Sequence, residues 1–133
     1  MKTTEPKVRK DIVYPELCFE IMGVLFKVQK ELGYGHKERY YENAVAVGFK
    51  KNGLKYERQL RVPLKFEGSE VGYYFFDFLV DGKIVLELKQ GNSFSKKNID
   101  QVVAYLKAFD LRLGILAQFT ADGVKYRRIV NVR

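Results

Sequence analysis

Two acidic residues and a lysine interrupt an apolar segment in the middle of the chain. Residues 75–89 read FFDFLVDGKIVLELK, where Asp77, Glu87 and Lys89 occupy places that Val, Ile or Leu would otherwise fill. A buried unpaired charge is costly, so each acid must face water, pair with a cation or bind a metal ion. Two carboxylates that converge at a strand end suit Mg²⁺ or Mn²⁺, and a neighbouring lysine could orient the attacking water. The hairpin alone slightly favours the simpler interpretation, an ordinary surface ion pair.

Whether the two acids meet depends on the turn between their strands. If residues 81–82 formed a regular two-residue loop, Asp77 and Glu87 would point to opposite faces of the hairpin. A three-residue loop over 80–82 would instead place Asp77 opposite Val85, which shares a face with Glu87. An Asp-Gly pair suits either turn. We therefore predict an odd loop or a bulge here as the condition for a site.

Two segments with helical periodicity carry further polar residues on their apolar faces. Glu38 lies three and seven residues before Tyr41 and Val45, which places this acid on the buried stripe of its helix. Gln101 and Tyr105 are four residues apart and neighbour one another on a later helix. Each has an ordinary alternative role, because a first-turn glutamate favours the helix dipole and a buried tyrosine commonly packs in a core.

The periodicity of the apolar residues predicts the elements that must position these side chains. Pro63 indicates that its strand lies at an edge or contains a bulge. The nearly continuous apolar segment 111–119 is typical of a central strand covered on both faces. The order ααβββαββ predicts one mixed sheet with helices packed against it, an α/β (α+β) layered domain. The predicted helices cover residues 15–32, 37–51 and 96–109, and the predicted strands cover 55–66, 71–80, 83–89, 111–119 and 124–132.

Length, composition and charge bound the class of protein. With 133 residues, 47% of them hydrophobic, the chain suits one globular domain over residues 14–133 after a charged tail at 1–13. No apolar run approaches the roughly 18 residues that cross a bilayer, and the N-terminus lacks a secretory signal, so we expect a soluble cytoplasmic protein without a membrane partner. The single cysteine, Cys18, excludes a disulfide within one chain. The net charge of +8 favours polyanionic partners without requiring one.

Three motifs together resemble a known group of enzymes. Asp77 followed by Glu87-Leu88-Lys89 resembles the signature of the PD-(D/E)xK phosphodiesterase superfamily, an aspartate on one strand and Glu-x-Lys on the next. GHKERYY at 35–41 resembles the Gly-x-x-Glu-x-x-Tyr motif that names the GxxExxY family, and its motif residues are Gly35, Glu38 and Tyr41. QVVAY at 101–105 is similar to the Gln-x-x-x-Tyr motif of RecB-type nucleases. The similarity runs from YPELCFEI to RRIVN, nearly the whole chain.

The resemblance implies a restriction-endonuclease-like three-layer domain, in which helices flank a central mixed sheet. It also implies roles for the core residues. Asp77 and Glu87 would hold the metal, with the Leu88 backbone carbonyl as a further ligand. Glu38 would add a third carboxylate or bind through water, and Lys89 would act on the nucleophilic water. The implied reaction is metal-assisted hydrolysis of a phosphodiester with in-line attack by water.

Residues outside this core have candidate roles in holding the substrate. By the same resemblance, Gln101 and Tyr105 would orient the phosphate or Lys89. His36 lies in a Gly-flanked loop beside Glu38 and could touch substrate, although an exposed loop residue is the simpler interpretation. Charged residues are common on exposed faces of helices and strands. Four further basic residues could nevertheless line a path for the phosphates of the nucleic-acid backbone. They are Lys96, Lys97, Arg127 and Arg128.

The sequence therefore predicts a Mg²⁺- or Mn²⁺-dependent nuclease that acts on DNA or RNA, with DNA favoured. A catalytically weak nucleic-acid-binding or protein-interaction module that retains the fold is the alternative, and hydrolysis of another phosphate ester is a third. A module without catalysis has no need for Glu38, Asp77, Glu87 and Lys89 together, which favours the enzyme. Because the chain is short for such a core, a second protomer could complete the substrate groove as a homodimer.

Overall fold

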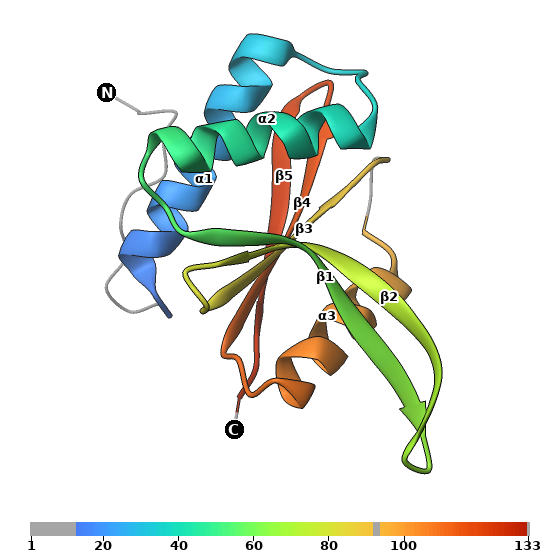
Figure 1. Cartoon of the computed structure of the whole chain (residues 1–133). Helices are drawn as coiled ribbons and strands as arrows, with labels where there is room; N and C mark the ends of the chain where they lie inside the picture. Colours follow the sequence, from blue (N-terminus) through green and yellow to red (C-terminus); the bar gives the residue numbers. More distant parts are fainter. Residues whose placement is uncertain (1–12, 92–93, 133) are drawn as a thin grey trace.

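The structure, a computed structural model, describes residues 13–91 and 94–132 (Figure 1). Within this part of the chain the elements follow the predicted order, and the tail predicted over residues 1–13 lies outside the described residues except for Val13. The helices are α1 (Pro15–Leu32), α2 (Glu38–Lys51) and α3 (Lys96–Ala108). The strands are β1 (Tyr56–Phe66), β2 (Ser69–Val80), β3 (Ile84–Lys89), β4 (Leu113–Thr120) and β5 (Gly123–Val130).

The first two helices begin and end where local chemistry favours it. Pro15 opens α1, where its missing N–H costs nothing, and Gly33 caps the other end with a left-handed φ of 74°. Helix α2 carries Glu38 in its first turn and Lys50 and Lys51 in its last, which complements the helix dipole. None of the helices in the described residues combines the length and apolar character needed to span a bilayer.

The strands of the described residues form one mixed sheet in the order β1-β2-β3-β4-β5. Strands β3 and β4 run parallel, and the other neighbours are antiparallel. Strand β1 forms an edge, as Pro63 predicts, because proline has no N–H to donate to a second neighbour. Every residue of β4 is buried, which confirms the predicted central strand.

Helices cover both faces of this sheet (Figure 1). Leu25 of α1 and Val45 of α2 belong to the core cluster on one face, together with Ile115 of β4. Leu106 of α3 belongs to a second cluster on the other face, with Leu116. Adjacent residues of β4 thus enter different clusters, as the pleat requires. The predicted α+β arrangement, a mixed sheet with flanking helices, is confirmed.

Near Gln59 and Asp77, the side chains of the β1–β2 hairpin switch from one face of the sheet to the other. Phe76 packs in the cluster beneath α3, whereas Phe78 packs in the cluster beneath α1 and α2. Residues two apart on a regular strand share a face, so the strand is locally irregular between them. On β1 the paired positions Arg58–Phe78 and Leu60–Phe76 flank Gln59 and Asp77, and Gln59 has a left-handed φ of 53°. The irregularity therefore lies at a candidate site residue.

The turn between β2 and β3 is an odd loop, as predicted, but it begins one residue later. Val80 pairs with Ile84, which leaves Asp81–Lys83 as the loop instead of the predicted 80–82. The first two loop residues have φ of 53° and 65°. Two successive residues with left-handed φ form a type I′ turn, which Asp-Gly favours. The third loop residue, Lys83, is one more than a regular two-residue loop contains. The N–H of that residue donates to the Val80 carbonyl at 3.0 Å.

Candidate active site

Asp77 and Glu87 lie where β2 and β3 stop pairing. The ladder between these strands ends at Phe78 and Leu86. Beyond it the Asp77 backbone N–H donates to Glu87 Oε1 at 2.9 Å, and the Leu88 N–H donates to Asp77 Oδ2 at 2.7 Å. Carboxylate oxygens thus accept hydrogen bonds from backbone N–H groups that would otherwise donate to a neighbouring strand. These bonds fix both acids at the point where the two strands separate.

The register brings the two acids to one side of the hairpin. Extending the observed pairing by one residue places Asp77 opposite Glu87, so the predicted position opposite Val85 is wrong by two residues. The reason is the later start of the loop. Because the loop still has an odd number of residues, the condition set by the sequence is met and the acids converge.

Burial sets the protonation of this pair. Asp77 is 9% exposed and Glu87 is 6% exposed. Loss of water raises the pKa of Asp77, and burial reinforced by the Asp77 charge raises the pKa of Glu87 to about 8. The ammonium of Lys89, 3.3 Å from Glu87 Oε2, opposes this shift in part. Near neutral pH and without another cation, burial therefore favours a proton shared by this pair.

Glu38 approaches the pair from the start of α2. Burial, followed by the charge of Asp77, raises the pKa of its carboxyl, while Lys89 and the backbone N–H of Gln90 lower it. Glu38 and Lys89 also share the lining of a pocket of about 280 Å³. The structure therefore brings together the four residues that the sequence singles out, Glu38, Asp77, Glu87 and Lys89.

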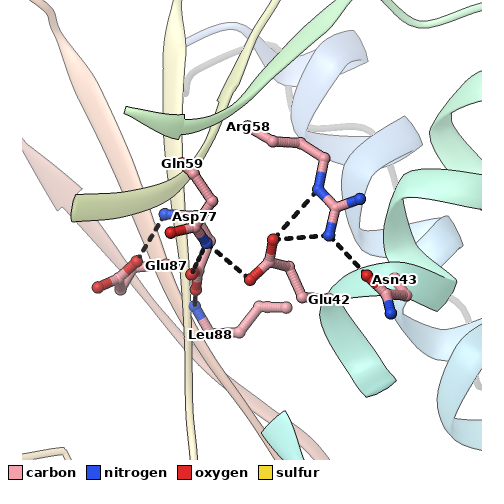
Figure 2. A network of polar contacts seen from close by, with 7 residues as sticks. All are labelled: Glu42, Asn43, Arg58, Gln59, Asp77, Glu87 and Leu88. Atoms are coloured by element: carbon pink, nitrogen blue, oxygen red, sulfur yellow. Dashed lines mark hydrogen bonds and ion pairs between the residues drawn. The ribbon is translucent and has the colours of Figure 1, made fainter. Parts of the chain in front are cut away.

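Three further residues, missed by the sequence analysis, support the acids (Figure 2). Arg58 holds the buried Glu42 in a fork, with Nη2 at 2.7 Å and Nε at 3.1 Å from Oε2. Gln59 Nε2 donates to Glu42 Oε1 at 2.8 Å and reaches Asp77 Oδ1 at 3.4 Å. The amide of Gln59 thus joins a structural acid on α2 to a candidate ligand on β2.

A sequence signal existed for one of these three residues. Glu42 follows Glu38 by four residues, so the two acids share one face of α2. Nothing in the pattern of β1 marks Gln59, because its role depends on a left-handed backbone in the middle of a strand.

The two predicted residues on α3 lie apart from this network. Tyr105 is buried, and its ring packs on Phe76 at a centroid distance of 4.6 Å, directly before Asp77 in the chain. Burial raises the pKa of its hydroxyl. Gln101 lies one turn earlier on α3 and is partly buried. Neither residue is among those drawn in Figure 2, and Tyr105 contacts the strand of Asp77 through Phe76.

The basic residues proposed for substrate contacts are spread over the surface. Lys96 and Lys97 are exposed at the start of α3, where Lys96 pairs with Asp100 at 3.2 Å. Arg127 is exposed on β5. Arg128 points the other way, toward the start of α1, and donates to the Val13 carbonyl at 3.2 Å.

His36 lines the same pocket as Glu38 and Lys89. Its Nε2–H donates to the Leu32 carbonyl at 2.8 Å, at the end of α1. This bond holds the ring against the helix end, beside the candidate site.

The carboxylates can serve a cation that needs few protein ligands. No group of three or more His, Cys, Asp or Glu side chains among the described residues is arranged to hold a metal ion. In each acid of the pair, one oxygen accepts a backbone bond, while the other has a longer contact. These contacts are 3.4 Å for Asp77 Oδ1 with Gln59 and 3.3 Å for Glu87 Oε2 with Lys89. Two hard oxygens suit Mg²⁺ or Mn²⁺, which keep several waters and take substrate oxygens.

Comparisons with known proteins bear on the family. A crystal structure of SSO0001 aligns with 88% of this chain and 78% of its own, at 16% identity and a TM-score of 0.47. No curated protein gives a significant match. The family model of the PD-(D/E)XK nuclease superfamily matches residues 15–129, which run from the start of α1 to the next-to-last residue of β5. The chain therefore belongs to the PD-(D/E)XK nuclease superfamily.

Proposed function

We propose that this protein is a divalent-metal-dependent nuclease that hydrolyses phosphodiester bonds of nucleic acid. One observation carries the proposal. Two buried acids, Asp77 and Glu87, converge at a break in the sheet, and each is held by a backbone N–H. Burying this pair is costly without a cation, and Lys89 offsets only part of the cost. Membership of a nuclease superfamily supports the same reaction class.

Asp77 Oδ1 and Glu87 Oε2 would hold the metal ion, because the other oxygen of each acid is anchored by backbone. In a β-strand the N–H and C=O of one residue point to the same side. The Leu88 N–H points at Asp77, so its carbonyl is directed toward the same region and could be a further ligand. Bound there, Mg²⁺ or Mn²⁺ would lower the pKa of a water molecule and neutralise phosphate charge.

The remaining residues would position water and phosphate. Lys89 carries a positive charge beside Glu87, suited to holding the attacking water or a phosphate oxygen. Glu38 could accept a hydrogen bond from a metal-bound water, since it lies within electrostatic reach of Asp77. Gln101 and Tyr105 would act from α3, where Tyr105 packs behind the strand that carries Asp77.

Finer assignments belong to the same proposal. The residues Gly35, Glu38 and Tyr41 support placement in the GxxExxY family. The Tyr41 hydroxyl donates to the Gly33 carbonyl and ties the loop before α2 to that helix, which gives the motif tyrosine a structural reason. We further propose DNA as the favoured substrate and a homodimer as the working form, with a second protomer completing the groove.

Metal binding can be tested by calorimetric titration of Mg²⁺ and Mn²⁺. We expect wild type to bind one of these ions and Glu87→Ala to lose the binding. Glu20→Ala, which removes an exposed acid from α1, is the matched control and should behave as wild type. Equal binding by wild type and Glu87→Ala would reject the assignment of the metal site.

Turnover can be tested with plasmid, single-stranded DNA and RNA substrates. Asp77→Ala and Lys89→Ala should abolish metal-dependent cleavage while circular dichroism shows a folded protein. Cleavage that persists in both variants would contradict the mechanism. A wild type that binds nucleic acid but cleaves none of the substrates would favour the alternative, a binding module that keeps the fold.

A further inference from the structure

A pocket of about 280 Å³ opens beside the candidate active site, between the loop before α2 and the end of β3. We propose that it binds the nucleoside next to the scissile phosphate, with the ring of Tyr34 stacking on the base. The inference rests on the proposed function, because it names the part of the substrate that this side of the site receives. Its lining residues other than glycine are Tyr34, His36, Glu38, Tyr41, Leu88, Lys89, Gln90 and Phe119.

The inner wall of the pocket is a rigid aromatic pair. The rings of Tyr41 and Phe119 stack at a centroid distance of 4.2 Å and an interplanar angle of 7°. Both residues are buried, at 4% and 6% exposure. The Tyr41 hydroxyl donates to the Gly33 carbonyl and accepts from the His36 N–H at 3.3 Å. The wall is therefore anchored to the loop that closes the pocket.

The outer rim presents an aromatic ring that the fold does not bury. Tyr34 is 59% exposed, although it lies in a short loop whose neighbouring residues are tied down. The Gln90 amide Nε2 donates to the His36 carbonyl at 3.2 Å, which links the loop to the chain after β3. An exposed tyrosine in a fixed loop beside a pocket suits stacking on a flat ligand, because the loop loses little conformational entropy on binding.

The distribution of charge orients the ligand. Lys89 and Glu38 belong to the lining of the pocket, and they are the groups assigned to the phosphate and its water. The rest of the lining includes the rings of Tyr34, Tyr41 and Phe119, together with Leu88 and the polar groups of His36 and Gln90. A nucleotide would fit this combination of charged and aromatic groups, because its phosphate can contact the charged groups and its base can stack on the rings.

Size limits the ligand further. Ligand sites for small molecules commonly enclose roughly 300–1,000 Å³, and this pocket, at about 280 Å³, is slightly smaller. It suits one nucleoside. A base enters such a pocket only when it is free of its pairing partner, so the inference favours single-stranded or locally opened substrate at this position.

The test compares two tyrosines that are similarly exposed. Tyr34→Ala should raise the KM for cleavage of a single-stranded oligonucleotide about tenfold, with little change in kcat. Tyr34→Phe keeps the ring and should retain the wild-type KM. Tyr40, 51% exposed on α2 and absent from the pocket lining, gives the matched control Tyr40→Ala, which should behave as wild type. An unchanged KM in Tyr34→Ala, or an equal rise in Tyr40→Ala, would overturn the inference.

An abasic substrate tests the contact directly. Removing the base next to the cleaved bond should weaken binding to wild type by about the same factor as Tyr34→Ala, and should cost nothing further in that variant. Additive losses would contradict stacking. Metal-free anisotropy with the intact and abasic oligonucleotides gives the same comparison without turnover. A wild type that neither binds metal nor cleaves would thus reject the proposed function, while the anisotropy comparison still decides whether the pocket holds a base.

Discussion

Asp77 and Glu87 are joined across the break between β2 and β3, because the Asp77 backbone N–H donates to Glu87 Oε1 at 2.9 Å. The acid on one strand therefore holds the backbone of the acid on the other. Changing Glu87 alters both the charge of the site and the support of its partner. Isosteric substitutions that keep this bond are accordingly the sharpest probes of the pair.

The first prediction concerns pH. Glu87 has a pKa of about 8 in the folded protein, against an ordinary value of 4.5, so folding favours its protonated form. In metal-free protein its contribution to stability is fully present below pH 4.5 and is lost as the pH rises toward 8. We expect Glu87→Gln, which stays neutral, to melt several degrees above wild type at pH 8, and the difference to vanish near pH 4.

Thermal melts in the presence of EDTA measure this effect, and Glu20→Gln on the exposed side of α1 is the control. Saturating Mg²⁺ should then stabilise wild type at pH 8 and leave Glu87→Gln little changed. A variant that melts below wild type at pH 8 without metal would show that the buried charge is not the dominant cost.

The second prediction concerns the left-handed residue on β1. Gln59 has φ of 53°, where a side chain is strained and glycine is not. Gln59→Gly should therefore be more stable than Gln59→Ala by about 1 kcal/mol. At Arg61, a paired position of the same strand, the order should reverse, because glycine weakens a regular strand.

Both Gln59 variants should also lose metal affinity, because each removes the amide that reaches Asp77 Oδ1. Urea denaturation supplies the stabilities and calorimetry supplies the affinities. If Gln59→Gly restored stability and kept wild-type metal affinity, the amide would have no role in positioning Asp77.

The third prediction separates a buried ion pair from an exposed one. Arg58 holds Glu42, whose side chain is 12% exposed, whereas Arg61 and Glu70 pair in solvent at 47% and 42% exposure. Arg58→Ala leaves a buried carboxylate without its fork and should cost roughly 1–3 kcal/mol of unfolding free energy. Arg61→Ala should change the stability far less, because water screens an exposed ion pair.

Adding Glu42→Gln to Arg58→Ala should recover part of the loss, since the unpaired charge disappears. A double-mutant cycle by chemical denaturation measures this coupling. Similar small losses for Arg58→Ala and Arg61→Ala would indicate that water reaches Glu42 freely.

The fourth prediction uses two helical glycines with different surroundings. A Cβ on Gly48 of α2 would lie 2.6 Å from Val24 Cγ1, whereas a Cβ on Gly23 of α1 would meet nothing within 4 Å. Gly48→Ala should therefore destabilise by about 1–3 kcal/mol through overpacking. Gly23→Ala should stabilise by about 0.5–1 kcal/mol through helix propensity.

Val24→Ala combined with Gly48→Ala should relieve the clash and recover part of the stability, which thermal melts can follow. If Gly48→Ala alone stabilised the protein, the close contact between α1 and α2 would not limit their packing.

Much of the architecture could be predicted from the sequence, because the helical and alternating periods of apolar residues report which face of each element is buried. The buried stripe of α1, the edge position of the strand with Pro63 and the fully covered β4 all follow from local patterns. The acids and the lysine of the candidate site could also be identified from the sequence, because a charged residue within an apolar segment is costly to bury unless it is paired or binds a ligand.

The tertiary structure alone decided how those residues meet. Asp-Gly is compatible with loops of two or three residues, so the register that sets Asp77 against Glu87 depends on the pairing of whole strands. The contact from Gln59 depends on a left-handed backbone at the point where a hairpin changes faces, which no local pattern encodes. The residue types thus determined which chemical groups were available, while long-range packing determined which of these groups lie together in one site.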